Sequence, residues 1–104
     1  MSDGISVSFI IPAYQAGATI ERCVNSVLRI RSFNYEVIVV NDGSTDNTRE
    51  LVEKIASVHE EVKLINQHNC GRSAARNKGI DVSCGHWMMF IDADDYVALN
   101  MFEV

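Results

Sequence analysis

The chain alternates short apolar runs with amphipathic segments, and this alternation limits its fold more than any other feature. Runs rich in β-branched and aromatic residues predict strands at residues 6–11, 35–41, 62–66 and 87–91. The segments between them have apolar residues at helical spacing and predict helices at residues 19–30, 46–58 and 72–82. Because strands that alternate with helices return to the same end of a sheet, the sequence predicts a three-layer α/β fold with a parallel sheet.

Composition and charge fit a single globular domain. The chain has 104 residues, 47% hydrophobic and 22% charged, which excludes a disordered protein. No apolar run approaches the ~18 residues of a membrane span, and we expect no leader sequence at the start. A net charge of -5 argues against a dedicated nucleic-acid binder, which needs a basic face. Three cysteines are a poor disulfide framework, so we expect a cytoplasmic protein, with membrane association of a longer form left open.

Polar residues follow each predicted strand. Parallel strands bring their carboxyl ends to one edge of the sheet, where α/β proteins bind ligands. The segments that would meet there are residues 12–14, 41–43, 66–72 and 92–95. The sequence therefore predicts a binding site along this edge.

The segment after the fourth predicted strand carries Asp92, Asp94 and Asp95. Carboxylates this close repel one another unless a cation or hydrogen-bond donors lie between them. Oxygen ligands favour a hard cation such as Mg²⁺ or Mn²⁺, which takes one or two protein carboxylates and completes its shell with water and phosphate. The alternative is a solvated turn in which Asp94 or Asp95 caps a helix, but the position at a strand end favours a ligand site.

Two further segments have both a structural and a functional interpretation. Asp42 follows the second predicted strand and either accepts backbone N–H groups of its turn or binds a nucleotide N–H or hydroxyl. Arg72 and Arg76 lie near the start of the third predicted helix. They either form a solvated basic face or, with the helix N-terminus, attract phosphate or stack on a base.

Several other side chains are interpreted as structural. Cys23 lies on the apolar stripe of the first predicted helix and is expected in the core. Val58 is expected to be buried, and Met88, Met89 and Trp87 are expected to pack in or beside the fourth strand. Four residues resemble a zinc ligand set, but their one-residue spacing argues against such a site: His68, Cys70, Cys84 and His86.

Four segments, taken together and in this order, resemble glycosyltransferase family 2: residues 9–14 (FIIPAY), 37–46 (VIVVNDGSTD), 71–79 (GRSAARNKG) and 90–95 (FIDADD). The resemblance covers nearly the whole chain. It implies the GT-A fold, a Rossmann-like three-layer sheet of alternating βα units. It also implies an inverting enzyme that transfers a sugar from a nucleotide-diphospho-sugar, with UDP-sugars favoured, to a saccharide or lipid-linked acceptor, as in polysaccharide biosynthesis.

The resemblance also implies roles for single residues. The nucleotide-binding positions would be Pro12, Ala13, Tyr14, Asp42, Arg72 and Asp92. Among them, Asp42 would contact the nucleobase and Asp92 the ribose. Asp94 would hold a divalent metal ion, Mn²⁺ or Mg²⁺, that bridges the diphosphate.

This sequence departs from the family pattern in two respects. Gln15 stands where the family often has asparagine. The family's catalytic base and acceptor site lie well downstream of the acidic motif, beyond residue 104. We therefore expect residues 1–104 to be a single donor-binding domain, a fragment of a longer enzyme, that is inactive or weakly active alone. A sheet cut short would leave an unpaired edge, so we also expect self-association.

Other functions are less consistent with the sequence. A non-catalytic nucleotide-binding or assembly module would keep this fold without the chemistry. A receiver-type signalling domain needs acidic residues after its first strand, where this chain has Pro12, Ala13 and Tyr14. A nucleotidyltransferase needs a glycine-rich, lysine-bearing phosphate loop, which the sequence lacks.

Overall fold

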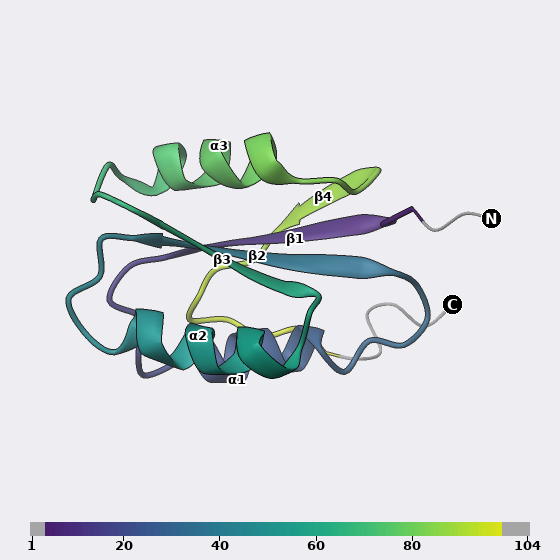
Figure 1. Ribbon diagram of the computed structural model, residues 1–104, viewed down its shortest axis with the longest axis horizontal. Helices are drawn as coiled ribbons and strands as arrows, with labels where there is room; N and C mark the ends of the chain where they lie inside the picture. The colour runs from purple at the N-terminus through teal and green to yellow at the C-terminus, as the bar shows by residue number, and fades with distance from the viewer. Residues whose placement is uncertain (1–3, 99–104) are drawn as a thin grey trace.

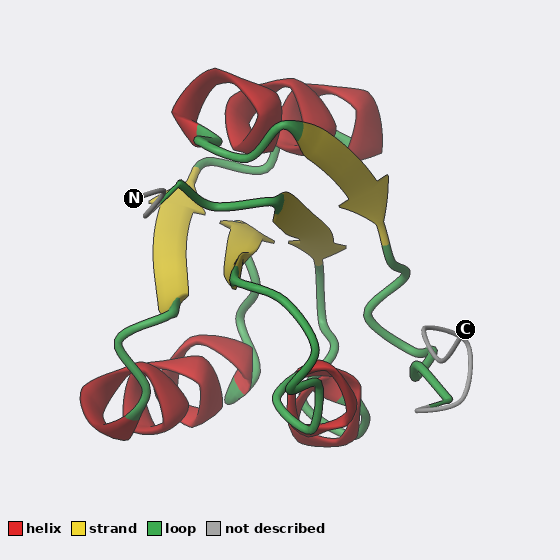
Figure 2. Ribbon diagram, turned by 90° about the vertical axis from the view of Figure 1, so that its right-hand side faces the viewer, coloured by secondary structure: helices red, strands yellow, loops and turns green. Residues whose placement is uncertain are grey.

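Four parallel strands form one sheet that carries helices on both faces (Figure 1). The computed structural model describes residues 4–98. Its elements are β1 (Val7–Ala13), α1 (Ile20–Val27), β2 (Tyr35–Asp42), α2 (Thr48–Val58), β3 (Val62–Gln67), α3 (Arg72–Val82) and β4 (Trp87–Phe90). The strand order is β3-β2-β1-β4. Figure 2 shows α3 on one face of the sheet and two helices, α1 and α2, on the other, which confirms the predicted three-layer α/β fold.

The central strands β1 and β2 supply much of the core. Every residue of β2 is buried, and only Val7 of β1 is partly exposed. The two strands stay in register from the pair Val7–Tyr35 to the pair Ala13–Asn41. Consecutive β-branched residues suit this position because helices cover both faces of the strands.

The two faces of the sheet are packed differently. The larger core cluster lies on the side of α1 and α2 and includes Val24 and Val52. The cluster under α3 is small and includes Ala75. Helix α3 lies so close to the sheet that a Cβ atom on Gly79 would be 2.4 Å from Cγ2 of Ile10. Glycine is therefore required at this position of α3.

Strand β1 continues through Pro12, where the sequence predicted its end. Pro12 pairs in register with Val40 of β2. The carbonyl of Ile10 accepts the N–H of Ile91 at 3.0 Å, so Ile10 directs its backbone groups toward β4. Pro12, two residues later, faces the same side, but β4 has already ended at Phe90. The missing N–H of the proline therefore costs no bond of the ladder.

The predicted helix boundaries differ from the observed ones by a few residues. Helix α1 spans Ile20–Val27 and α2 begins at Thr48, so both are shorter than predicted. The prediction that Val58 is buried is wrong, because this last residue of α2 is 75% exposed. Residues 96–98 are not helical, and the rest of the tail lies outside the described residues. No helix within residues 4–98 is long and apolar enough to cross a membrane.

The predicted burial of the fourth strand is also wrong. Trp87 is 73% exposed, Met88 46% and Met89 37%. The reason is the position of β4, which pairs with β1 on one side and, within residues 4–98, with no strand on the other. The apolar run correctly predicted a strand but not its place at the edge of the sheet.

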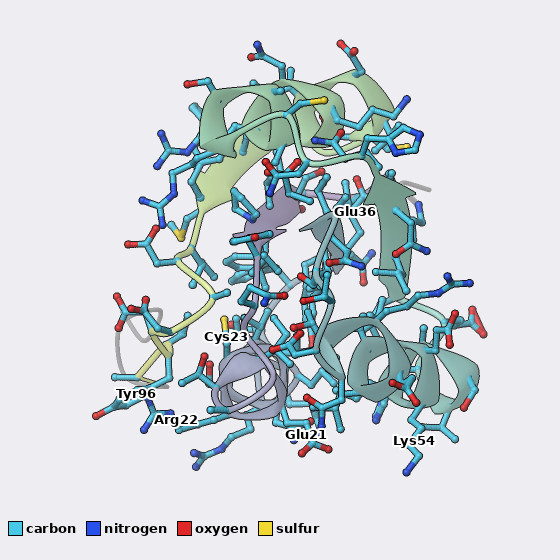
Figure 3. All side chains as sticks on the ribbon, turned by 90° about the vertical axis from the view of Figure 1, so that its left-hand side faces the viewer. Glu21, Arg22, Cys23, Glu36, Lys54 and Tyr96 are labelled. Carbon is cyan, nitrogen blue, oxygen red and sulfur yellow. The ribbon has the colours of Figure 1, made fainter. Side chains whose placement is uncertain are left out.

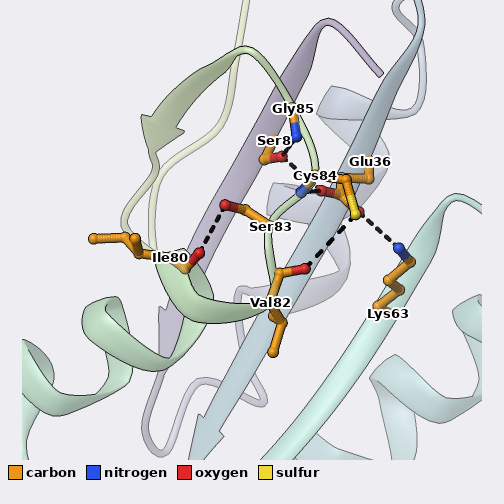
Figure 4. Close-up of polar contacts among 8 residues, drawn as sticks. All are labelled: Ser8, Glu36, Lys63, Ile80, Val82, Ser83, Cys84 and Gly85. Carbon is orange, nitrogen blue, oxygen red and sulfur yellow. Dashed lines mark hydrogen bonds and ion pairs between the residues drawn. The ribbon is translucent and has the colours of Figure 1, made fainter. Parts of the chain in front are cut away.

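The amino end of the sheet is closed by the buried carboxylate of Glu36 (Figure 4). Its Oε2 accepts the Ser8 hydroxyl at 2.6 Å and the Cys84 N–H at 2.7 Å, and its Oε1 pairs with Lys63 Nζ at 2.7 Å. The Gly85 N–H donates to the Ser8 hydroxyl at 2.9 Å. Burial raises the pKa of Glu36, but these donors outweigh it and lower that pKa below its ordinary value. The network joins the segment after α3 to the starts of three strands.

Candidate functional site

A cavity of about 630 Å³ opens at the carboxyl ends of the strands. The arrowheads of β2 and β4 point toward this end, on the left of Figure 1. Six of the seven residues predicted to bind nucleotide or metal line the cavity: Pro12, Ala13, Tyr14, Asp42, Arg72 and Asp94. The seventh, Asp92, is not among its lining residues but lies 3.4 Å from the guanidinium of Arg72. The structure thus brings the predicted residues together at one place.

Asp42 is the buried acidic group of the site, with 5% of its surface exposed. Its Oδ1 accepts the Gln67 amide at 2.9 Å and the Cys70 N–H at 2.8 Å, and its Oδ2 accepts the Gly71 N–H at 3.0 Å. Burial raises the pKa of Asp42, but these donors outweigh it and lower the pKa below its ordinary value. A carboxylate has about four acceptor sites, so Oδ2 can accept one more donor from the cavity.

Asp42 does accept backbone N–H groups, but the structural interpretation was wrong about where they come from. The backbone donors come from the loop before α3, not from the turn of Asp42 itself. That loop lies close to the turn, because a Cβ atom on Gly43 would be 2.7 Å from the Asn69 nitrogen. Gly43 also has a φ of +76°, which favours glycine. Asp42 fixes the loop that carries the start of α3 into the cavity wall.

Gln15 is a residue of the cavity wall to which the sequence assigned no role. It has a φ of +52°, a left-handed conformation that is uncommon outside glycine. Its N–H donates to the Ser44 hydroxyl at 2.9 Å, and its side-chain oxygen accepts the Thr45 N–H at 2.6 Å and the Asp46 N–H at 3.3 Å. These bonds tie the loop after β1 to the loop after β2. The only signal in the sequence was that glutamine stands here where the family often has asparagine.

Asp46 and Thr48 tie the same two loops together. The Gly17 N–H donates to Asp46 Oδ2 at 2.9 Å, and the Ala16 N–H donates to the Thr48 hydroxyl at 2.9 Å. Hydrogen bonds from Thr48 and Gly17 lower the pKa of Asp46. Asp46 is thus structural: it fixes the loop after β1, which forms part of the cavity wall, but does not line the cavity itself.

Arg72 lies at the first position of α3 and faces the acidic segment. Its guanidinium is 3.4 Å from Asp92 Oδ1, and both side chains are about half exposed. An exposed pair of this kind contributes little to stability, so both groups are available to a ligand. Arg76, one turn later, does not line the cavity, and its guanidinium lies 5.6 Å from the centre of the Phe90 ring.

The acidic segment presents exposed carboxylates of which Asp94 reaches the cavity. Across the described part of the chain, no three His, Cys, Asp or Glu side chains gather to form a metal site by themselves. A hard cation held by one or two carboxylates needs no such group, because phosphate and water complete its shell. The single oxygen ligand Asp94 in an open cavity fits that kind of metal binding.

Cys23 of α1 is fully buried beneath this segment, as predicted. Burial raises the pKa of Cys23 to about 12, and the negative charges of Asp95 and Asp94 contribute. The thiol is therefore protonated at neutral pH. The other two cysteines lie before and after α3, near opposite ends of β2. The Cys70 N–H donates to Asp42, and the Cys84 N–H donates to Glu36.

Comparisons with known proteins agree on one family. The sequence profile described as "Glycosyl transferase family 2" matches residues 8–104. The protein named uncharacterized glycosyltransferase YibD of Escherichia coli (strain K12) is 41% identical over 103 residues, which are 99% of this chain and 30% of that protein. The chain thus spans less than a third of the length of this relative.

Solved structures show the same similarity. The structure of S. aureus TarS 1-349 in complex with UDP-GlcNAc has a TM-score of 0.84 at 29% identity, covering 95% of this chain and 29% of that one. Mannosyltransferase PcManGT from Pyrobaculum calidifontis, in complex with GDP-Man and Mn²⁺, has a TM-score of 0.82 at 26% identity, covering 90% of this chain and 29% of that one. These neighbours share the GT-A fold, which the sequence predicted.

Proposed function

This chain belongs to glycosyl transferase family 2, and from that premise we propose that it binds a nucleotide-diphospho-sugar in the cavity at the carboxyl ends of its strands. The observation that carries the proposal is the convergence of the six predicted residues on that cavity, with the buried carboxylate of Asp42 in its wall. The similar structures with UDP-GlcNAc and GDP-Man support the class of ligand.

Each part of the wall has a task in this proposal. Asp42 Oδ2 accepts an N–H of the nucleobase, and Pro12, Ala13 and Tyr14 contact the nucleoside. Arg72 approaches the base and the ribose, and Asp92, which pairs with Arg72 beside the cavity, binds the ribose. We favour UDP over GDP as the nucleotide because the family resemblance implies uracil beside Asp42.

Asp94 is the residue that would hold a divalent cation, Mn²⁺ or Mg²⁺, beside the diphosphate. Such a cation, when bound, offsets the negative charge that develops on the departing diphosphate. The similar PcManGT structure, which is in complex with GDP-Man and Mn²⁺, supports the presence of a divalent cation beside the nucleotide-sugar. Arg72 and the N-terminus of α3 add positive potential near the same place.

The reaction we propose for the whole enzyme is sugar transfer with inversion. An acceptor hydroxyl attacks the anomeric carbon opposite the diphosphate, the new glycosidic bond forms, and the bond to the diphosphate breaks. The hydroxyl proton passes to a general base. We place that base and the acceptor site in sequence that this chain does not cover, since the YibD relative is matched over only 30% of its length. We expect the 104-residue chain to bind donor without efficient transfer.

Calorimetric titration of the chain with UDP and with GDP, with and without MnCl₂, tests this proposal. We expect Mn²⁺ to tighten the binding of UDP, and Asp94→Asn to abolish that increase. Asp95→Asn is the matched control, because it removes the same charge next to the cavity but not in its wall. If neither nucleotide binds, or if Asp94→Asn and Asp95→Asn behave alike, the proposal is wrong. Nucleotide binding without any metal effect would instead favour a non-catalytic nucleotide-binding module.

We also propose that copies of this chain associate through the edge of β4 that pairs with no strand within residues 4–98. The strand is short but carries four exposed apolar residues and no charge, so it lacks the charged side chains that keep exposed edges from pairing. Light scattering at increasing concentration is expected to detect dimers or larger species, and Met88→Lys is expected to reduce them. A monomer at all concentrations would contradict this proposal.

A further inference from the structure

The backbone of the acidic segment after β4 is held by side chains of one helix. Strand β4 ends at Phe90, and the Ile91 N–H makes the last bond to β1. The carbonyls of the three residues after Ile91, namely Asp92, Ala93 and Asp94, each accept a hydrogen bond from a side chain of α1 or of its N-cap residue Thr19. Helix α1, not the sheet, therefore determines where this segment lies.

The donors are spaced to form one face of the helix. The Thr19 hydroxyl donates to the Ala93 carbonyl at 2.9 Å, Arg22 Nη2 to the Asp94 carbonyl at 3.3 Å, and Cys23 Sγ to the Asp92 carbonyl at 3.5 Å. Ser26 completes the set, because its hydroxyl accepts the Val97 N–H at 2.8 Å. Residues 19, 22, 23 and 26 follow the spacing i, i+3, i+4 and i+7, which places their side chains in one line along a helix.

Contacts further along support the same attachment. The guanidinium of Arg22 lies 4.9 Å from the centre of the Tyr96 ring, and Figure 3 shows the two side chains close together beside α1. Val97 and Ser26 are both buried. The segment is thus anchored on both sides of its exposed carboxylates.

We propose that this face of α1, and Thr19 in particular, positions the Asp94 carboxylate in the nucleotide cavity. Thr19 bonds to the carbonyl of Ala93, the residue just before Asp94, and Thr19, Ala93 and Asp94 all line the cavity. The Thr19 side chain makes no capping bond to α1, so its hydroxyl is not needed to start the helix. The inference rests on the proposed function: Thr19 is a positioning residue that acts through the backbone on the metal-binding carboxylate.

The test compares Thr19→Val, which removes the hydroxyl at nearly constant volume, with Thr19→Ser, which keeps it. UDP affinity is measured with and without MnCl₂. We expect Thr19→Val to weaken UDP binding about fivefold with Mn²⁺ and to leave the metal-free affinity unchanged, since one hydrogen bond is lost. Thr19→Ser should restore the wild-type ratio. Ser57→Ala is the matched control, because it removes a hydroxyl that also donates to a backbone carbonyl but lies far from the cavity.

Hydrogen exchange of the peptide covering residues 91–97, without nucleotide or metal, provides a second readout. We expect faster exchange in Thr19→Val than in the wild type and in Thr19→Ser. Equal exchange in all three, or an equal loss of UDP affinity with and without Mn²⁺, would overturn the inference. If the wild type shows no metal effect but Thr19→Val speeds exchange, the proposed function fails while the anchoring of the segment by Thr19 stands.

Discussion

Strand β2 carries a buried carboxylate near each end, and the two groups form a natural comparison. Near its start, Glu36 accepts the N–H of Cys84, which follows α3; at its end, Asp42 accepts the N–H groups of Cys70 and Gly71, which precede α3. The same kind of bond therefore attaches α3 to the sheet at both ends. The two ends differ in what else surrounds the carboxylate.

Glu36 is paired with the ammonium group of Lys63 and is only 1% exposed. Asp42 has neutral donors only, and it lines the cavity. At the amino end the negative charge is therefore compensated within the protein. At the carboxyl end it is compensated by dipoles, and the carboxylate can accept a further donor. The comparison teaches that the same kind of hydrogen bond stabilises the fold at one end of β2 and, in the proposed function, leaves an acceptor for a ligand at the other.

Removing the Glu36 carboxylate, which holds the hydrogen-bond network at the amino end of β2, should lower the free energy of unfolding most. Glu36→Ala leaves the Ser8 hydroxyl and the Cys84 N–H without their acceptor and Lys63 without its partner. Each unsatisfied buried donor costs about 1–3 kcal/mol, so we expect the free energy of unfolding to fall by about 3 kcal/mol. Urea unfolding at neutral pH measures this change.

The control for that variant is Glu53→Ala, which breaks an exposed pair with Arg49. We expect a change of about 0.5 kcal/mol or less. UDP affinity of folded Glu36→Ala should stay within about twofold of the wild type, because distant sites act independently. A large loss of UDP affinity would mean that the two ends of β2 are coupled through α3.

Asp42→Asn tests the carboxyl end of β2, where the Asp42 carboxylate lines the cavity. The asparagine amide can accept through one side only, so either Gly71 or the pair Gln67 and Cys70 would face an NH₂ group. We expect the free energy of unfolding to fall by about 2 kcal/mol and UDP affinity to fall at least about tenfold. Glu36→Gln is the matched substitution and should affect stability alone. If both variants bind UDP like the wild type, the cavity does not use Asp42.

The sequence predicted the convergence at the carboxyl end because topology alone produces it. Parallel strands send Tyr14, Asp42 and Asp94 to one edge whatever their side-chain contacts are. The resemblance to the family then separated these residues from others on the same edge. Asp92 lies slightly apart, bound to Arg72, which spacing along the chain does not determine.

The hydrogen-bond network around Glu36, at the amino end of β2, was not predictable in the same way. Glu36 stands directly before an apolar run in β2, but its partners Ser8 and Lys63 are 28 and 27 positions away in the sequence. The same limit applied to β4: its apolar residues predicted a strand, but only the order of strands shows that it lies at an edge. Local patterns determine elements, whereas long-range pairs determine which of them are buried.

Acid titration tests how the ionised form of Glu36 contributes to stability. Both have pKa values lowered from the ordinary 4.5 for Glu36 and 3.8 for Asp42. A carboxyl group with a lower pKa in the folded chain stabilises the fold above its unfolded pKa and loses this contribution as the pH falls through the folded pKa. Urea midpoints should therefore fall below about pH 4.5, and more gradually in Glu36→Gln. Parallel curves for the two proteins would contradict a role for Glu36 ionisation.

The smallest effect is expected from substitutions of Gln15, whose uncharged side chain and backbone N–H join the loops after β1 and β2. Gln15→Gly loses the bonds to Thr45 and Asp46 but tolerates a φ of +52°, whereas Gln15→Ala loses the bonds and keeps the backbone strain. Gln15→Ala should thus be less stable than Gln15→Gly by about 1 kcal/mol in urea unfolding, and both should bind UDP a few-fold more weakly. Gln15→Asn keeps an amide and a tolerance for this φ, so it should lie nearest the wild type. If alanine and glycine proved equally stable, the left-handed backbone at this position would not be a feature of the folded protein.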